Sequence, residues 1–278
     1  GARITPRCVA LQAGDGPAGD ILWIGTGAPV LLRVGAGEQD DVRTIAASPA
    51  THLALGRLDN DPWPDLVLTD LKLIYPLDKT PPDFSRSVTI LWGTADGVNA
   101  EQSSALAIAN AFATTIGDLD ADGLADLAVS VNQGKETTKA SSLVYFGTGT
   151  RQLPAAGVPV TTEGAEGVAI VRPSPQSRPV AIFANAQQAT LDSAVPVRLF
   201  WGSREGFSTK AMVDFPNLSG YKSSLSDLNN DGHVDLVIIN GGDVAPSAIA
   251  RAPNVGANIY WGGPEGPIGN RGPTRFDP

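Results

Sequence analysis

The chain has 278 residues, of which 42% are hydrophobic, and a formal net charge of −9. A chain of this length can bury a full hydrophobic core. Its acidic balance argues against nucleic acid as a partner, because no basic stripe is present to meet phosphates. No apolar stretch reaches the roughly 18 residues that a membrane-spanning helix needs. The 31 glycines and 22 prolines are typical of a turn-rich all-β chain, and the lone Cys8 excludes an intrachain disulfide.

The first predicted elements are short apolar strands at 8–11, 20–25 and 30–34. The residues that join the first two are mostly Gly and Ala, so we predict no metal site there, although Asp20 opens the second strand. A second group of strands is predicted at 52–55, 66–68 and 88–93. His52 lies on one of these strands, and we expect it to be a core or channel residue rather than a catalytic one.

A loop of alternating carboxylates follows at 118–126, with the sequence Asp-Leu-Asp-Ala-Asp-Gly-Leu-Ala-Asp. Several hard oxygen atoms around one point, with a glycine in the turn between them, are how a protein holds Ca²⁺. We predict that the ion is bound by the side chains of Asp118, Asp120, Asp122 and Asp126 and by the backbone carbonyl of Leu124. The alternative is an acidic surface turn without a metal, but like charges this close repel one another unless a cation neutralises them.

The same pattern recurs at 227–235, where we predict side-chain ligands at Asp227, Asn229, Asp231 and Asp235 and a backbone ligand at His233. Neither loop is an EF-hand, because that loop needs a Glu at its twelfth position. The twelfth residues here are Val129 and Ile238, and they lie in β-branched runs that predict strands.

A weaker copy lies at 57–65, with carboxylates at Asp59, Asp61 and Asp65. Arg57 stands at the first ligand position and Pro62 replaces the glycine, so this loop is a less favourable Ca²⁺ site. We expect the guanidinium of Arg57 to pair with Asp59 and Asp61 in place of a cation. The corresponding stretch at 172–178, Arg-Pro-Ser-Pro-Gln-Ser-Arg, has no ligands at all.

A second motif, an apolar strand that ends in an aromatic residue and glycine, recurs at 88–93, 143–147, 197–202 and 258–262. Its glycines are spaced by 54, 55 and 60 residues (93 to 147, 147 to 202, 202 to 262). A period of this length, filled with short strands and turns, predicts one four-stranded sheet per repeat. The repeated aromatic position, Trp in three of the four copies, favours packing between sheets over sugar stacking.

The loop and strand that recur together at 118–129 and 227–238 resemble the FG-GAP (VCBS-type) repeats of β-propellers, a family that includes the integrin α-subunit head and many bacterial secreted proteins. The resemblance covers nearly the whole chain. It implies an all-β fold and a single β-propeller domain at 1–278, with four-stranded antiparallel blades at roughly 1–48, 49–105, 106–161, 162–215 and 216–278. Five repeats are fewer than the family leads one to expect. Either the ring closes with five blades, or the chain is part of a larger ring with two unpaired sheet edges.

In such blades the loops between first and second strands carry the metals on one face. The longer connections at 70–86, 132–141, 185–194 and 240–256 lie on the opposite face. Long loops on a rigid scaffold are common binding sites, so we expect a protein or carbohydrate ligand there; tolerated insertions are the alternative. A Ca²⁺ loop of modest affinity suits the high free Ca²⁺ outside cells, which predicts an extracellular, cell-surface or periplasmic protein.

Catalysis finds little support in the sequence. Its two histidines are His52 and His233, and no nucleophile elbow, zinc helix or phosphate loop is present. Three hypotheses follow: a Ca²⁺-stabilised binding or adhesion module, a structural subunit that associates through sheet edges or outer strands, and a polysaccharide-active lyase or hydrolase. The third would need a pair of carboxylates in a central channel.

Overall fold

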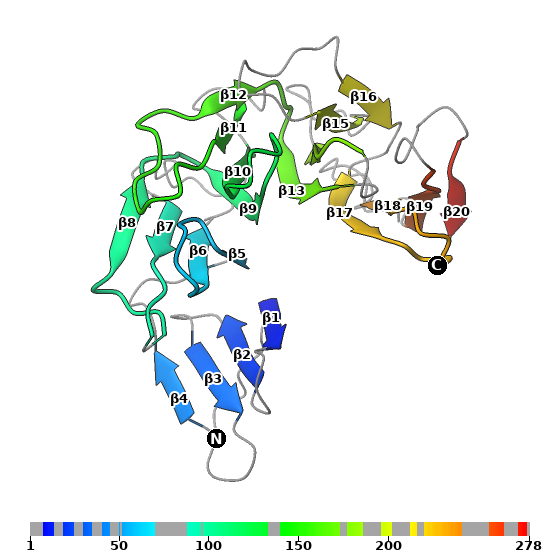
Figure 1. Cartoon of the computed structure of the whole chain (residues 1–278). Helices are drawn as coiled ribbons and strands as arrows, with labels where there is room; N and C mark the ends of the chain where they lie inside the picture. Colours follow the sequence, from blue (N-terminus) through cyan, green and yellow to red (C-terminus); the bar gives the residue numbers. More distant parts are fainter. Residues whose placement is uncertain are drawn as a thin grey trace, which may run out of the picture. The chain divides into compact units, whose positions relative to one another are not determined.

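The computed structural model describes residues 8–13, 19–24, 30–34, 41–44, 50, 52–69, 88–95, 97–132, 140–172, 177–185, 196–201, 212–215, 220–240, 256–263 and 272–276. These residues form strands and turns without any helix, and they build five four-stranded sheets (Figure 1). In each sheet the strands follow one another in chain order, and the registered pairs are antiparallel. The prediction of an all-β chain made of four-stranded antiparallel sheets is confirmed. In the described part of the chain there is no helix that could cross a membrane.

The chain divides into two compact units, of which the first comprises Gly1–Arg57 and Asp61–Thr114. One of its sheets contains β1 (Cys8–Ala13), β2 (Gly19–Ile24), β3 (Val30–Val34) and β4 (Asp41–Thr44). The other contains β5 (His52–Gly56), β6 (Asp65–Thr69), β7 (Val88–Leu91) and β8 (Ser103–Leu106). The core of this second sheet is a cluster of Ala50, Leu53, Leu66, Leu68 and Leu91.

The second unit comprises Leu58–Asn60 and Thr115–Pro278. Its first sheet contains β9 (Ala111–Gly117), which starts in the first unit, and β10 (Asp126–Val131), β11 (Ser142–Tyr145) and β12 (Val158–Val160). The second sheet contains β13 (Ala165–Val171), β14 (Val180–Asn185), β15 (Val197–Trp201) and β16 (Met212–Phe215). The third contains β17 (Gly220–Ser226), β18 (Asp235–Asn240), β19 (Gly256–Tyr260) and β20 (Thr274–Phe276).

In three of the sheets the second strand is buried along its whole length. Every residue of β6, β10 and β14 is buried, whereas β8 alternates between exposed and half-buried residues. A strand that is covered on both faces needs apolar side chains on both faces. This explains why these strands are continuous apolar runs and could be predicted from the sequence.

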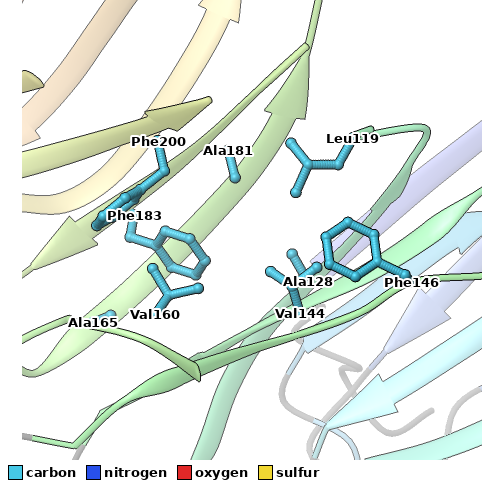
Figure 2. Packing of buried hydrophobic residues seen from close by; sticks show 9 residues of the cluster. All are labelled: Leu119, Ala128, Val144, Phe146, Val160, Ala165, Ala181, Phe183 and Phe200. Atoms are coloured by element: carbon cyan, nitrogen blue, oxygen red, sulfur yellow. The ribbon is translucent and has the colours of Figure 1, made fainter. Parts of the chain in front are cut away.

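Neighbouring sheets of the second unit pack face to face. Leu119, Ala128, Val144, Phe146 and Val160 meet Ala165, Ala181, Phe183 and Phe200 of the next sheet in one core (Figure 2). Phe183 and Phe200 make an edge contact with their ring centroids 6.0 Å apart. A second core joins β13–β16 to β17–β20, where Phe215 and Tyr260 make an edge contact at 4.8 Å. Burial of this apolar surface contributes roughly 25 cal/mol per Å² to stability.

The aromatic residue of the second motif packs between sheets in two of the repeats. Phe146 belongs to the core shared with β13–β16, and Trp201 packs against the core shared with β17–β20. Trp92 is 3% exposed, and its indole Nε1 donates a hydrogen bond to Ser104 Oγ. Trp261 is 38% exposed, although its Nε1 likewise donates to a hydroxyl, that of Thr274. The packing between sheets that the sequence favours is therefore seen for Phe146 and Trp201.

Candidate metal centre

Three carboxylates of the loop between β9 and β10 converge. Asp118, Asp120 and Asp126 each offer an oxygen atom, and these atoms lie within 4.8 Å of one another. Asp126 is fully buried, whereas Asp118 and Asp120 are half-buried. Such a group of hard oxygen atoms could hold a metal ion. Asp122, the fourth predicted carboxylate, is exposed and lies outside this group of three.

Hydrogen bonds from the backbone shape the loop. Asp122 N donates to Asp118 Oδ1 (3.1 Å) and to Asp120 Oδ1 (3.3 Å), and Gly123 N donates to Asp118 Oδ2 (3.2 Å). Leu124 N donates to Asp122 Oδ1 (2.8 Å). Short Asp side chains favour such turns because they reach backbone N–H groups a few residues ahead. The chain turns at two positive φ angles, 63° at Ala121 and 88° at Gly123, and so winds around the carboxylates.

Asp126 closes the loop and also fixes it to the sheet. Its Oδ2 accepts a hydrogen bond from Leu119 N (2.7 Å), and its Oδ1 accepts one from Gly147 N (2.8 Å). The pKa of Asp126 is raised to about 6, mainly by burial and also by the nearby charges of Asp120 and Asp122, which together outweigh the lowering effect of the two backbone bonds. A cation at this point would favour the ionised form of the carboxyl.

The bond from Gly147 connects the two sequence motifs. A Cβ atom at Gly147 would lie 2.0 Å from the carbonyl oxygen of Ala125, so only glycine fits this close approach. Equivalent bonds run from Gly93 N to Asp65 Oδ1 (2.8 Å) and from Gly262 N to Asp235 Oδ1 (2.7 Å). The glycine of the aromatic motif therefore holds the last Asp of the loop in its own repeat.

The loop at 227–235 has the same internal hydrogen bonds. Asp231 N donates to Asp227 Oδ1 (3.1 Å) and Asn229 Oδ1 (3.1 Å), and Gly232 N donates to Asp227 Oδ2 (2.9 Å). His233 N donates to Asp231 Oδ1 and Leu228 N donates to Asp235 Oδ2, both at 2.9 Å. The positive φ angles also recur, 59° at Asn230 and 85° at Gly232. Side chains as different as Leu124 and His233 leave the backbone of the loop unchanged.

Asn229 makes the one local difference. Its amide Nδ2 donates to Asp231 Oδ2 (2.9 Å), a bond that a carboxylate at this position cannot make. The backbone bond from His233 lowers the pKa of Asp231, and the Asn229 amide lowers it further. The Nδ1 atom of the His233 ring is buried and has no hydrogen-bond partner among the described residues. The role predicted for His233 involves only its backbone carbonyl and not this ring.

The carboxylates of the weaker loop at 57–65 have partners from the protein. Asp61 Oδ1 accepts a hydrogen bond from Trp63 N (2.8 Å). Asp65 is fully buried, and its Oδ1 accepts a hydrogen bond from Gly93 N. Asp59 forms an ion pair with Arg151, with Nε and Oδ2 3.0 Å apart. The guanidinium on Asp59 thus comes from a residue that the sequence did not single out, while the predicted partner, Arg57, is exposed.

The fourth repeat has lost the closing carboxylate together with its loop. Val180 pairs with Trp201 in the register of β14 and β15. In the preceding sheet Leu127 pairs with Tyr145. One residue further along this antiparallel pair, Asp126 lies opposite Phe146, the aromatic residue of the motif. A buried valine, 1% exposed, therefore stands where the other repeats have Asp.

Sequence reasoning missed one half-buried carboxyl group at the other end of the strands. Glu166, on β13, accepts a hydrogen bond from Asn132 Nδ2 at Oε1 (3.1 Å). Burial raises its pKa to about 7, and the bond from Asn132 lowers it by a smaller amount. The signal in the sequence is a single charged residue in the otherwise apolar run Ala-Glu-Gly-Val-Ala-Ile-Val.

His52, which the sequence predicts to be a core or channel residue, lies at the start of β5. His52 Nδ1 accepts a hydrogen bond from Thr114 N (3.5 Å), which agrees with a structural role. The central parts of the four long connections, 70–87, 133–139, 186–195 and 241–255, lie outside the described residues, so the ligand surface stays a prediction.

No protein-family model matches the chain, and a comparison with curated proteins likewise gives no match.

Proposed function

We propose that the chain is a calcium-stabilised binding module with the β-propeller architecture of FG-GAP (VCBS-type) repeats. It acts outside the cell, at the cell surface or in the periplasm, and recognises protein or carbohydrate through the loops opposite the metal loops. The observation that carries the proposal is the convergence of Asp118, Asp120 and Asp126 within 4.8 Å. The identical hydrogen bonding of the loop at 227–235 supports a second site of the same kind.

Calcium is the ion that suits these ligands best. All predicted ligands are oxygen atoms from carboxylates, an amide or backbone carbonyls, and Ca²⁺ accepts six to eight such ligands in flexible geometry. Zinc and copper favour nitrogen and sulfur ligands. Mg²⁺ demands a near-ideal octahedron and keeps most of its water. The acidic residues of each loop would also repel one another less with an ion bound.

Thermal unfolding with and without Ca²⁺ tests the metal site. A ligand that binds only the folded state at about 100 times its Kd stabilises it by about 2.7 kcal/mol. We expect Ca²⁺ to raise Tm and EDTA to reverse the rise. Asp118→Asn should remove most of the contribution of its loop, because it removes one charge from the group of three carboxylates. The matched control is Asp214→Asn. Asp214 is a carboxylate of β16 that pairs with Arg198 of β15, and this variant should keep the full Ca²⁺ response. A wild-type Tm that does not change when Ca²⁺ is added would contradict the proposal.

A glycan array, together with a panel of extracellular matrix proteins, tests the binding role. Binding that needs Ca²⁺ and disappears in EDTA is expected, because the metal loops brace the sheets whose far ends carry the ligand loops. Asp118→Asn should weaken that binding, whereas Asp214→Asn should leave it unchanged. Absence of binding to any glycan or protein probe, in a sample whose Tm responds to Ca²⁺, would contradict the binding role and leave the metal site intact.

A second candidate function, assembly with another copy of the chain, is favoured by apolar side chains of β18 and β20 that are exposed among the described residues of the second unit. In the register of the sheet β17–β20, Ile239, Ala257 and Phe276 form one row. Ile239 is 45% and Phe276 53% exposed. Leu199 in the preceding sheet is the counterpart of Ile259, because each lies two residues before the aromatic residue of its motif. Leu199 is 2% exposed, because the next sheet packs on it. A sheet of the same kind fits such a face, and a second copy can supply it.

The molar mass in solution tests this assembly. The wild type should shift from monomer to dimer as its concentration rises, and Ile239→Ser with Phe276→Ser should hold it as a monomer. Glu101→Gln, at an exposed position far along the chain, is the control and should dimerise like the wild type. A wild type that stays monomeric over the whole concentration range would contradict the assembly role.

A further inference from the structure

We infer that Arg151 is the built-in cation of the loop at 57–65 and fastens the segment Leu58–Asn60 to the turn after β11 without a metal ion. We call the ion pair of Arg151 and Asp59, with the backbone contacts around it, the Asp59 clasp. The inference goes beyond the proposed function, because it assigns this loop a permanent partner within the protein.

The geometry of the clasp combines an ion pair with backbone pairing. Arg151 Nε lies 3.0 Å from Asp59 Oδ2, and the Asp59 side chain is only 6% exposed while that of Arg151 is 36% exposed. Asp59 and Gly149 form an isolated parallel bridge, and Asn60 N donates to Gly149 O (3.2 Å). Leu58 beside them is 1% exposed. The segment is therefore anchored by its backbone, its charge and an apolar side chain.

The turn that carries Arg151 is held in shape by its own hydrogen bonds. Thr148 Oγ1 lies 2.8 Å from Thr150 Oγ1 and donates to Gln152 O (2.7 Å), and Gln152 N donates to Thr150 Oγ1 (3.3 Å). Gly149 has a φ of 68°, and a Cβ there would lie 2.6 Å from Asn60 Nδ2. A side chain at this position would strain the backbone at its positive φ and would require the Asn60 amide to move. These hydrogen bonds hold the turn in the conformation that places Arg151 beside Asp59. Little conformational entropy is therefore lost when the ion pair forms.

Chemistry explains why the cation at this loop is a guanidinium. A buried carboxylate is costly unless a charge and hydrogen bonds compensate it. With Arg57 at the first ligand position and Pro62 in the turn, the loop lacks the ligand and the glycine of its two relatives. A guanidinium stays charged at any physiological pH and matches a carboxylate geometrically. The clasp therefore does not depend on free Ca²⁺, unlike the two loops that we propose as metal sites.

Arg151→Gln tests the clasp, with Arg198→Gln as the matched control. Arg198 makes a comparable ion pair with Asp214, with Nε and Oδ1 3.2 Å apart, on the surface of another sheet. Hydrogen exchange of the Asn60 amide should accelerate by about tenfold or more in Arg151→Gln. It should keep its wild-type rate in Arg198→Gln. The Tm of Arg151→Gln should fall by the same amount in Ca²⁺ and in EDTA.

A double-mutant cycle keeps the test decisive if Arg151→Gln folds poorly. Arg151→Gln leaves Asp59 buried without its cation, so Arg151→Gln with Asp59→Asn should recover part of the lost Tm. Three results would overturn the inference: wild-type exchange of the Asn60 amide in Arg151→Gln, additive effects of the two substitutions, or a loss of Tm that Ca²⁺ restores. The last would mean that a metal ion serves this loop. None of these results bears on the Ca²⁺ response of Asp118→Asn, so the two proposals fail separately.

Discussion

At the scale of single residues, Glu166 shows how burial changes the chemistry of a common side chain. It is a carboxyl group on an apolar strand, next to the Asn132 amide and with no cation among its described neighbours, and burial raises its pKa to about 7. The folded state therefore prefers the protonated acid. A raised carboxyl pKa stabilises the fold at low pH, and this stabilisation is lost as the pH rises from the unfolded pKa, 4.5, through about 7.

We predict that Glu166→Gln removes this pH dependence. Gln keeps an oxygen that accepts the bond from Asn132 and carries no charge, so the variant should be more stable than the wild type at pH 8, by about 2–3 kcal/mol. The two should converge near pH 4.5. Urea denaturation at a series of pH values measures the difference, with Glu101→Gln as the exposed control. A Glu166→Gln variant that is less stable than the wild type at pH 8 would show that the ionised carboxylate has a partner.

At the scale of elements, the metal loop and the glycine of the next motif form one structural unit. Asp126 uses both oxygen atoms to bind the backbone, one within the loop and one on Gly147. Asp65 keeps the bond to its own glycine in the weaker loop at 57–65. The closing Asp therefore has a structural role in the repeats of Asp65, Asp126 and Asp235, in addition to any role as a ligand.

This double role predicts competition between protons and Ca²⁺ at the loop 118–126. Because the pKa of Asp126 is raised to about 6, the metal-free protein should become more stable as the pH falls from 7 towards 5. Ca²⁺ needs the ionised carboxylate, so its affinity should fall by up to about tenfold per pH unit below 6. Calorimetric Ca²⁺ titrations between pH 5 and pH 8 measure this. Asp227→Asn isolates the loop by weakening the other site, and an affinity that is constant over this range would contradict the prediction.

Elements differ in how well their sequences reveal them. The second strands β10 and β14 could be predicted because they are buried on both faces and hence mainly apolar. An outer strand such as β8, Ser-Ser-Ala-Leu, carries no comparable pattern, because it faces solvent on alternate residues. The loops could be predicted because their hydrogen bonds are local. The pair of Arg151 and Asp59 could not, since it joins residues 92 positions apart and depends on how the turn after β11 folds.

At the scale of the whole molecule, the two proposed metal sites belong to different sheets and different cores. The loop at 118–126 precedes β10, and its Leu119 lies in the core shared by β9–β12 and β13–β16. The loop at 227–235 precedes β18, whose Leu236 and Ile238 lie in the core shared with β13–β16. The sheet β13–β16 contacts both cores and has no metal loop of its own. If each loop binds Ca²⁺ as proposed, each ion stabilises its own sheet through separate packing.

Separate packing predicts that the two sites contribute additively. Asp118→Asn and Asp227→Asn are matched substitutions, because both carboxylates accept bonds from the same two backbone positions of their loops. Each should remove its own share of the Ca²⁺-dependent stability, and the double variant should lose the sum within about 0.5 kcal/mol. Denaturation at fixed free Ca²⁺ measures all three. A double variant that loses much more or much less than the sum would mean that β13–β16 transmits the effect of one ion to the other site.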